Sequence, residues 1–269
     1  MTKQVRDLMH PGLITCRRDT PLGQAAMLLL RHRIHALVVT DRDDRPVGLL
    51  SDFDLLAGEW LSKDAESLET MRGMTAGELM SAPLNTIEAD ASAEEAAQRM
   101  RAEGFHRLIV SDQGRLTGVL SISDLVAHLA AGEPVRRATV ADVMSHAILV
   151  CRDDTPARQV ARTMTEARYR SVLVLDREGQ PRGVVSGWDL LACFENEAGM
   201  ETTAGQVMHP ALTIRPSASL LQAANLMIEH HYHRLVVVDP ERPQAVPVGI
   251  LSSYDIVNEM ARPGSVWLT

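Results

Sequence analysis

The stretch Gly48-Leu49-Leu50-Ser51-Asp52-Phe53-Asp54 has the form Gly-apolar-apolar-Ser-x-x-Asp, and the chain writes this form four times. The other copies are Gly118–Asp124, Gly183–Asp189 and Gly249–Asp255. Each copy follows an apolar-Met pair, first seen at Leu8-Met9, by about forty residues. A pattern that returns at a fixed spacing marks a repeat architecture, so the chain is one supersecondary unit used four times.

The first copy shows the layout of the unit. Leu13–Thr15 is a short extended piece, and Thr20-Pro21 opens a helix, since Thr is a good N-cap and Pro suits the first helical position. The apolar run Ala36–Thr40 predicts a strand, and Val47–Leu50 predicts a second one after a polar turn. Ser51 then caps a further helix. The predicted order is β-α-β-β-α.

The copies fall into two kinds that alternate along the chain. A spacing of 135 residues links Asp54 to Asp189 and the run that begins at Cys16 to the one that begins at Cys151. Copies two and four instead share Phe105-His106-Arg107-Leu108 and Tyr232-His233-Arg234-Leu235. Both also begin their first helix with a capping box, Ser-x-x-Glu or Ser-x-x-Gln. The order is therefore A-B-A-B, which predicts two modules, each built from two unlike halves.

These residues resemble the CBS domain, named for cystathionine β-synthase, over almost the whole chain from Val5 to Met260. The resemblance implies an α/β (α+β) fold with four β-α-β-β-α repeats paired into two Bateman modules, each with two related clefts. The expected domains are residues 1–62, 74–130, 138–196 and 202–262, and the expected modules are residues 1–130 and 138–269. Ala131–Thr139 is the predicted linker, and Gly58–Thr75 and Glu197–Thr203 are the long internal connections.

Composition excludes several classes of protein. The net charge is −8 and aromatic residues make up 3% of the chain, which disfavours phosphate neutralisation and base stacking on nucleic acid. No apolar run has the length of a membrane span, and the start of the chain has no apolar signal core, so we expect no membrane insertion. Three widely spaced cysteines, Cys16, Cys151 and Cys193, fit a reduced, cytoplasmic protein.

The repeated Ser-x-x-Asp has a structural and a functional interpretation. Structurally it is a capping box. The usual last residue of a capping box is Glu or Gln, whereas all four copies here end in Asp, so capping alone does not explain the choice of residue. Functionally, a helix N-terminus offers N–H groups and a positive dipole end to a phosphate. The CBS resemblance implies that the aspartates bind ribose hydroxyls and the serines lie beside phosphates. The ribose set is Asp54, Asp124, Asp189 and Asp255, and the phosphate-side set is Ser51, Ser121, Ser186 and Ser252.

The pairs His106-Arg107 and His233-Arg234 are the second candidate site. A pair of this kind at the start of a strand is usually a solvated edge. Both pairs nevertheless resemble strand starts of the γ subunit of AMP-activated protein kinase, where such residues reach nucleotide phosphates, and an Arg fork suits phosphate oxygens. The matching residues of copies one and three are His35 and Arg170, so the A and B clefts should differ. Adenine would lie on small residues near the first strand, weakly specified as Ile14, Thr15, Ile148 and Leu149.

Other chemistry finds no support. The run His230-His231-Tyr232-His233 has no Cys or carboxylate partner at ligand spacing, so we expect no metal site. The sequence contains no P-loop motif, no Gly-x-Gly-x-x-Gly motif and no pattern typical of a Ser-His-Asp catalytic triad, so we expect no enzyme activity and no catalytic cofactor.

We therefore expect a regulatory sensor that binds an adenosine nucleotide (AMP, ADP or ATP) and signals to a separate effector protein. We also expect a homodimer that uses the helices after the motif aspartates, unless two modules pair in this way within one chain. Two alternatives stay open. One is a structural or oligomerisation scaffold with empty clefts. The other is the same fold binding S-adenosylmethionine, NAD(H) or a cyclic dinucleotide, although the His-Arg pairs favour an anionic phosphate.

Overall fold

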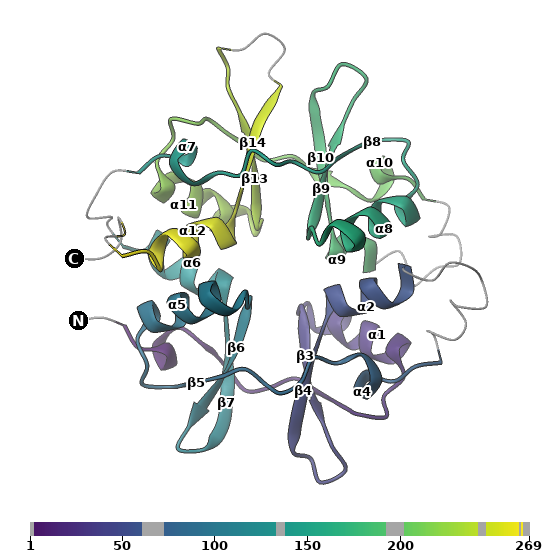
Figure 1. Cartoon of the computed structure of the whole chain (residues 1–269), viewed down its shortest axis with the longest axis vertical. Coiled ribbons are helices and arrows are strands. Elements are labelled where there is room, and N and C mark those ends of the chain that lie inside the picture. Colours follow the sequence, from purple (N-terminus) through teal and green to yellow (C-terminus); the bar gives the residue numbers. More distant parts are fainter. Residues whose placement is uncertain are drawn as a thin grey trace. The chain divides into compact units, whose positions relative to one another are not determined.

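A computed structural model describes residues 3–60, 73–132, 138–191, 202–241, 246–263 and 265 (Figure 1). These residues form two compact units, each built from separated stretches of the chain. Unit 1 comprises residues 1–13, 85–148 and 212–269, and unit 2 comprises residues 14–84 and 149–211. Cys193, most of the two predicted long connections and the middle of the predicted linker lie outside the described residues.

The predicted β-α-β-β-α order is confirmed in all four repeats. In each repeat the first strand runs parallel to the second, and the second runs antiparallel to the third. Repeats 1 and 3 belong to unit 2, and repeats 2 and 4 belong to unit 1.

Repeat 1 contains β2 (Thr15–Arg17), α1 (Leu22–His32), β3 (Ala36–Thr40), β4 (Pro46–Ser51) and α2 (Asp52–Trp60). Repeat 2 contains β5 (Thr86–Glu88), α5 (Ala93–Glu103), β6 (Arg107–Asp112), β7 (Arg115–Ser121) and α6 (Ile122–Ala130). Repeat 3 contains β8 (Val150–Arg152), α8 (Ala157–Ala167), β9 (Ser171–Leu175), β10 (Pro181–Ser186) and α9 (Gly187–Leu191). Repeat 4 contains β12 (Thr213–Ile214), α11 (Leu220–His230), β13 (Arg234–Val238), β14 (Pro247–Ser252) and α12 (Ser253–Met260).

A short segment before each repeat, here called its leader, was not predicted as structure. The leaders are residues 4–12, 75–83, 139–147 and 203–211. Each begins with one helical turn, η1 (Val5–Asp7), α4 (Ala76–Leu79), α7 (Val140–Val143) or α10 (Ala204–Val207). Leaders 1 and 4 continue into the two-residue strands β1 (His10–Pro11) and β11 (His209–Pro210).

Each leader packs on a repeat other than the one it precedes. Strand β1 of leader 1 pairs with β7 of repeat 2, and β11 of leader 4 pairs with β10 of repeat 3. Leaders 2 and 3 make isolated bridges instead, which include Ser81 to Leu49 of repeat 1 and Ser145 to Ile250 of repeat 4. Repeats 1 and 2 thus exchange leaders, and so do repeats 3 and 4.

The exchange explains why each leader carries Met and each motif begins with Gly. A Cβ added to Gly48 would lie 2.5 Å from the Met80 sulfur, and one added to Gly183 would lie 2.5 Å from the Met208 sulfur. Gly118 meets Met9 in the same way, and Gly249 meets Met144. The glycines are needed for close approach between leader and strand, because any side chain would occupy the space of the thioether.

The predicted start of the first helix needs a small correction. Thr20 was predicted to cap α1, but its Oγ1 accepts a hydrogen bond from the Arg17 N–H at 3.0 Å, and α1 begins at Leu22. The Leu22 N–H donates to the Met74 carbonyl at 3.1 Å, next to leader 2. A backbone contact from a distant segment therefore satisfies the helix end that a side chain was expected to satisfy.

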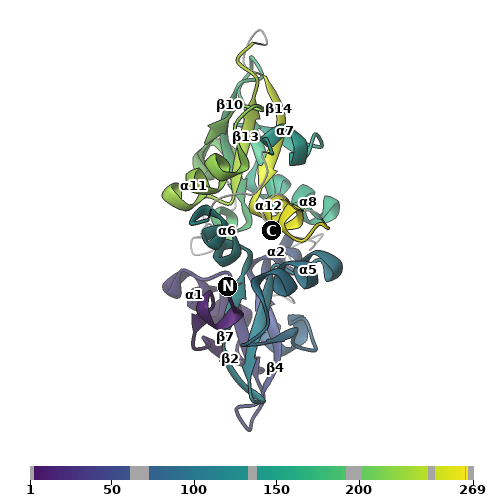
Figure 2. The same ribbon diagram turned by 90° about the vertical axis from the view of Figure 1, so that its left-hand side faces the viewer.

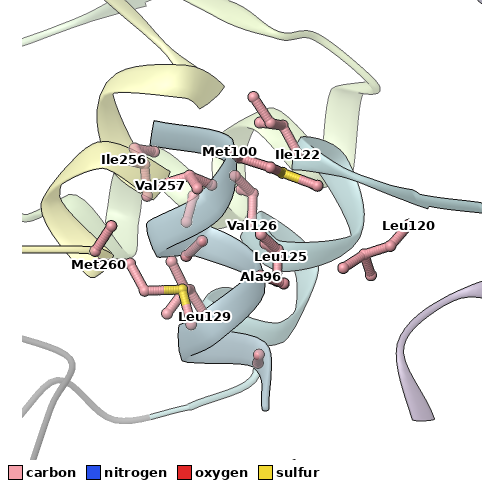
Figure 3. Close-up of a cluster of buried hydrophobic side chains, with 14 of the residues drawn as sticks. Ala96, Met100, Leu120, Ile122, Leu125, Val126, Leu129, Ile256, Val257 and Met260 are labelled. Atoms are coloured by element: carbon pink, nitrogen blue, oxygen red, sulfur yellow. The ribbon is translucent and has the colours of Figure 1, made fainter. Parts of the chain in front are cut away.

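The core of unit 1 joins repeats 2 and 4 through their helices. Helix α6 packs on α11 and α12, and α12 packs on α5 (Figures 1 and 2). Their apolar faces form one cluster, shown in Figure 3 by residues that include Met100, Leu125, Val126, Ile256 and Val257.

Unit 2 repeats this arrangement, with α2 packed on α8 and α9. Leu56 of repeat 1 lies in the core of repeat 3, and Leu191 of repeat 3 lies in the core of repeat 1. In both units, the helix faces predicted for a homodimer are covered by the chain itself. Homodimerisation stays a prediction. Among the described helices, none combines the length and apolar character of a membrane span.

Candidate functional site

The structural interpretation of Ser-x-x-Asp is confirmed in all four repeats. The Oδ2 atom of each motif aspartate accepts hydrogen bonds from the motif serine, at 2.7–2.8 Å from its N–H and 2.6–2.7 Å from its hydroxyl. The aspartate N–H donates back to the serine Oγ at 3.2–3.5 Å. The aspartates therefore have a structural role in the helix start, whatever they bind.

The start of each motif helix already uses part of its hydrogen-bonding capacity. The first helical N–H donates to a carbonyl at the start of the second strand: Asp52 to His35 at 3.1 Å, Ile122 to His106 at 3.1 Å and Ser253 to His233 at 2.9 Å. The third N–H belongs to the motif aspartate and is bonded to serine. Part of the N–H groups at these helix starts is therefore already paired within the protein.

The arginines of the two His-Arg pairs lie beside the motif serines. Arg107 is the cross-strand partner of Ser121, and Arg234 is the cross-strand partner of Ser252. Burial raises the pKa of Asp255, while its hydrogen bonds from Ser252 and the charge of Arg234 oppose that rise. The predicted juxtaposition of arginine, serine and aspartate is thus present in repeat 4.

Unit 1 brings together its two motif helices and the histidines of the two His-Arg pairs. The His106 ring of repeat 2 stacks on Tyr254 of repeat 4, with centroids 4.9 Å apart. Conversely, His233 Nδ1 of repeat 4 lies 3.3 Å from the Ser123 hydroxyl of repeat 2. Each histidine thereby contacts the residue that precedes the motif aspartate of the other repeat, so both His-Arg pairs flank one helix–helix junction.

Unit 2 has the same junction with a different charge balance. Arg170 lies over the Phe53 ring at 4.9 Å, and the rings of His35 and Trp188 are 5.1 Å apart. His35 Nδ1 also lies 2.8 Å from Oδ2 of the buried Asp52. Burial raises the pKa of Asp54 and lowers that of Arg170, whose charge interacts with Asp52 and Asp54.

Sequence reasoning missed the residue before each motif aspartate. Phe53, Ser123, Trp188 and Tyr254 occupy this position, and each contacts the strand start of another repeat. A signal was available, because three of these four residues are aromatic in a chain with only nine aromatic residues.

Two leader histidines were also missed. His10 Nε2 lies 2.9 Å from Oδ1 of Asp124, and His209 Nδ1 lies 3.1 Å from Oδ2 of Asp189. The signal for both was the tripeptide Met-His-Pro, which occurs in leaders 1 and 4 and is replaced by Met-Ser in leaders 2 and 3. The motif aspartates of repeats 2 and 3 therefore meet an imidazole from another repeat's leader.

The weak adenine candidates occupy the start of the first strand of repeats 1 and 3. Ile14 and Leu149 pack at the edge of the unit 2 cores, and their carbonyls accept hydrogen bonds from Val38 and Leu173. Thr15 is exposed on β2, and Ile148 is half-buried just before β8. These positions are compatible with an apolar contact surface but do not single out adenine.

Two grooves among the described residues are lined by residues outside the motif. A groove of about 360 Å³ in repeat 3 is lined by residues that include Cys151 and Thr155, and one of about 730 Å³ in repeat 4 by residues that include Ile214 and Arg215. Among the described residues, no group of three His, Cys, Asp or Glu side chains is placed to hold a metal ion.

Comparison with known proteins identifies relatives that share this repeat. A protein of unknown role from Methanocaldococcus jannaschii is 22% identical over 97% of this chain, and the alignment spans 62% of its length. The magnesium transporter MgtE of Thermus thermophilus is 30% identical over 50% of this chain and 30% of its own length. Hypoxic response protein 1 of Mycobacterium tuberculosis is 31% identical over 46% of this chain and 83% of its own length.

Two solved structures share the fold along almost the whole chain. One is a Methanocaldococcus jannaschii protein proposed as an archaeal homologue of the γ subunit of AMP-activated protein kinase, with a TM-score of 0.83 and 16% identity. The other is an uncharacterized conserved protein of Pyrococcus horikoshii, with a TM-score of 0.65 and 15% identity. Each covers 96% of this chain and 100% of the solved chain, and at these identities the likeness concerns the fold.

The family comparison agrees with the four repeats. The model of the CBS domain matches residues 5–59, 76–131, 140–196 and 204–262, so each match contains one leader and the repeat that follows it. With these four matches over most of its length, the chain belongs to the CBS domain family.

Proposed function

We propose that this protein is a regulatory sensor of adenosine nucleotides, AMP, ADP or ATP, that acts on a separate effector protein. CBS-domain proteins commonly bind adenosine ligands in regulatory roles. One observation carries the choice of a phosphate-bearing ligand. The helix–helix junction of unit 1 brings His106-Arg107 and His233-Arg234 together, and each arginine lies across from a motif serine.

The division of roles follows from chemistry. Asp124 and Asp255 would accept hydrogen bonds from ribose hydroxyls, because a carboxylate offers only acceptors and a ribose diol offers two donors. Arg107 and Arg234 would hold phosphate oxygens through their planar forks, with Ser121 and Ser252 beside them. In unit 2, Asp54 and Asp189 would be the corresponding ribose ligands, with Ser51 and Ser186 on the phosphate side. Adenine would contact Ile14, Thr15, Ile148 and Leu149.

The exchange of leaders supports the proposed pairing of repeats. Repeats 1 and 2 exchange leaders, as do repeats 3 and 4, which fits Bateman modules at residues 1–130 and 138–269. The domain limits proposed from the sequence, 1–62, 74–130, 138–196 and 202–262, would then each include a leader that docks on the other member of the pair.

Two alternatives make different predictions. S-adenosylmethionine carries a cationic sulfonium, which two arginines would repel, whereas NAD(H) and cyclic dinucleotides retain phosphates and would compete with AMP. A scaffold without a ligand would bind none of these. Native mass spectrometry of protein purified without added nucleotide separates a retained ligand from an empty protein.

The decisive experiment separates phosphate recognition from nucleoside recognition. In calorimetry, Arg107→Ala and Arg234→Ala should weaken AMP about ten- to a hundredfold, because a charge-assisted hydrogen bond contributes on the order of 1.5–3 kcal/mol, and should leave adenosine almost unchanged. Asp124→Ala and Asp255→Ala should weaken both ligands alike. Arg115→Ala, at an exposed arginine where β7 begins, is the matched control and should affect neither.

Two results would contradict the proposal. Equal losses for AMP and adenosine in the arginine variants would remove the phosphate role. Unchanged adenosine binding in the aspartate variants, with the fold intact by circular dichroism, would remove the ribose role and leave the capping box as the only function of Asp124 and Asp255.

A further inference from the structure

A buried carboxylate, Asp52, distinguishes the junction of unit 2 from that of unit 1. Asp52 is only 7% exposed and begins helix α2. Its Oδ2 lies 2.8 Å from His35 Nδ1, its Oδ1 accepts a hydrogen bond from the Phe53 N–H at 2.9 Å, and its charge interacts with Arg170. The carboxylate thus bonds to His35 directly and acts on Arg170 through its charge.

The other three repeats carry no acid at this position. The equivalent first helical residues are Ile122, Gly187 and Ser253, so Asp52 is peculiar to repeat 1. Neither the capping box nor the fold requires it. The box uses Ser51 and Asp54, and an apolar, a small and a hydroxyl residue are each accepted at the same point of the other repeats.

The basic residues that Asp52 engages correspond to the proposed phosphate ligands of unit 1. His35 and Arg170 directly precede the strand residues that lie opposite Ser51 and Ser186, as His106 and His233 precede those opposite Ser121 and Ser252. Unit 1 adds Arg107 and Arg234 at the next position, where unit 2 has Ala36 and Ser171.

The formal charges of the two junctions therefore differ. With histidines neutral, Arg107 and Arg234 balance Asp124 and Asp255 in unit 1. In unit 2, the one charge of Arg170 is set against the three carboxylates of Asp52, Asp54 and Asp189, of which Asp52 and Asp54 act on it directly. An anionic phosphate entering unit 2 would meet a site of net negative formal charge, in which Asp52 and Asp54 already act on the charge of Arg170.

We propose that Asp52 is a specificity-determining residue that takes the place of a ligand phosphate in unit 2. This proposal deepens the proposed function and rests on it. Unit 2 accepts the uncharged nucleoside part of a ligand through Asp54 and Asp189 and rejects the phosphate, whereas unit 1 accepts both. Only the junction of unit 1 then distinguishes a nucleotide from a nucleoside by its phosphate.

A reciprocal exchange of residues between repeats 1 and 4 tests this assignment. Asp52→Ser installs the residue of repeat 4 in repeat 1, and Ser253→Asp installs the carboxylate in unit 1 next to His233. The affinities of AMP and adenosine are measured by calorimetry, and the number of molecules bound is counted by native mass spectrometry.

We expect opposite changes. Asp52→Ser should raise the number of AMP molecules bound per chain and leave the number of adenosine molecules unchanged. Ser253→Asp should weaken AMP about tenfold or more relative to adenosine, since it introduces a carboxylate beside the phosphate. Ser253→Asn places a side chain of the same size as Asp at the same position without the charge, and serves as the control for Ser253→Asp.

A ligand-free measurement keeps the proposal testable if a variant is unstable. In the wild type, the ¹⁵N signal of His35 Nδ1 should show a nitrogen that donates to a carboxylate, and this signature should disappear in Asp52→Asn and Asp52→Ser. Its absence from the wild type would overturn the proposal.

The outcomes also separate this proposal from the proposed function. If the Arg107 and Arg234 variants discriminate AMP from adenosine but Asp52→Ser gains no AMP, only the role of Asp52 is wrong. If the arginine variants do not discriminate AMP from adenosine, the proposed phosphate function of unit 1 is wrong. An unchanged number of bound AMP molecules in Asp52→Ser would then overturn the role of Asp52 as well.

Discussion

The motif aspartates combine a structural and a proposed ligand-binding task at the scale of single residues. Each closes a capping box through Oδ2, and burial raises the pKa of Asp54 and Asp255. A buried carboxylate that keeps its charge at neutral pH is costly, because burial favours the protonated form. Keeping Asp54 and Asp255 charged therefore opposes folding, and ligand binding by these two residues stays a proposal.

Asp255 should therefore reduce stability as the pH rises. Because its pKa is raised above the ordinary 3.8, the folded state holds a proton that the unfolded state has lost, and stability falls as pH increases through the folded pKa. Asp255→Asn should keep the cap, as the amide of Gln206 does in the Thr203 box, and remove this dependence. Urea unfolding at several pH values should show that the unfolding free energy of the variant rises relative to that of the wild type as the pH increases from 3.8. A gain towards acid pH would contradict this account.

The cysteines are predicted to be inert. Burial raises the pKa of both Cys16 and Cys151 to about 11, and only the thiolate is nucleophilic. At pH 8 the thiolate fraction should be on the order of a hundredfold below that of an ordinary thiol with pKa about 8.5. Alkylation by iodoacetamide, followed by mass spectrometry of the peptides, should be slow at both sites until urea unfolds the protein. Rapid modification of either peptide in the native protein would contradict the burial argument.

At the scale of helices and strands, each leader docks on a repeat other than the one it precedes. The leader helices satisfy their ends on a distant repeat: the Val5 N–H donates to the Ala91 carbonyl at 2.8 Å, and the Ala204 N–H to the Thr155 carbonyl at 2.8 Å. The short strands β1 and β11 extend sheets in the same way. Each leader is too short to be stable alone, so its structure depends on the partner repeat.

Gly118→Ala tests the leader contact. The new Cβ would lie 2.4 Å from the His10 carbonyl oxygen, a backbone atom that can yield only if β1 moves, so a loss of about 1–3 kcal/mol in unfolding free energy is expected. Gly23→Ala is the matched control within α1, where nothing lies within 4 Å of the added Cβ, and should stabilise by about 0.5–1 kcal/mol. Thermal and urea unfolding measure both. Equal effects of the two substitutions would refute the contact.

The molecule as a whole uses its motif helices to join repeats within each unit. Helices α6 and α12 bury Val126 and Val257 against each other's repeats in unit 1, and α2 and α9 contribute Leu56 and Leu191 in unit 2. The sequence left two possibilities for these apolar faces, contact with a second chain or contact within the same chain. In the structure they are core.

A charge placed on such a face should unfold the protein instead of separating a dimer. Val126→Asp buries an unpaired carboxylate and should cost several kcal/mol, on the order of 3–5, whereas Met27→Asp, at a side chain that is 52% exposed, should have little effect. Light scattering at several concentrations, combined with thermal unfolding, distinguishes the results. A folded Val126→Asp monomer with wild-type stability would show that α6 is a dimer surface after all.

The sequence by itself determined the repeat, its β-α-β-β-α order, the A-B alternation and the capping role of Ser51, Asp54 and their equivalents. These features depend on residues close together in the chain, whose spacing matches the geometry of one helix turn or strand. It also determined that His106-Arg107 and His233-Arg234 begin equivalent strands. The expectation that the A and B clefts differ follows from the same alternation.

Only the tertiary structure decided which repeats meet. The exchange of leaders, the His106–Tyr254 stack and the reach of His209 to Asp189 each join residues far apart in the sequence. Periodicity in one chain carries no information about which of several similar surfaces pair. Asp52 illustrates the limit: in the sequence it is one x of Ser-x-x-Asp, and only its burial against His35 and Arg170 distinguishes it from a solvated helix start.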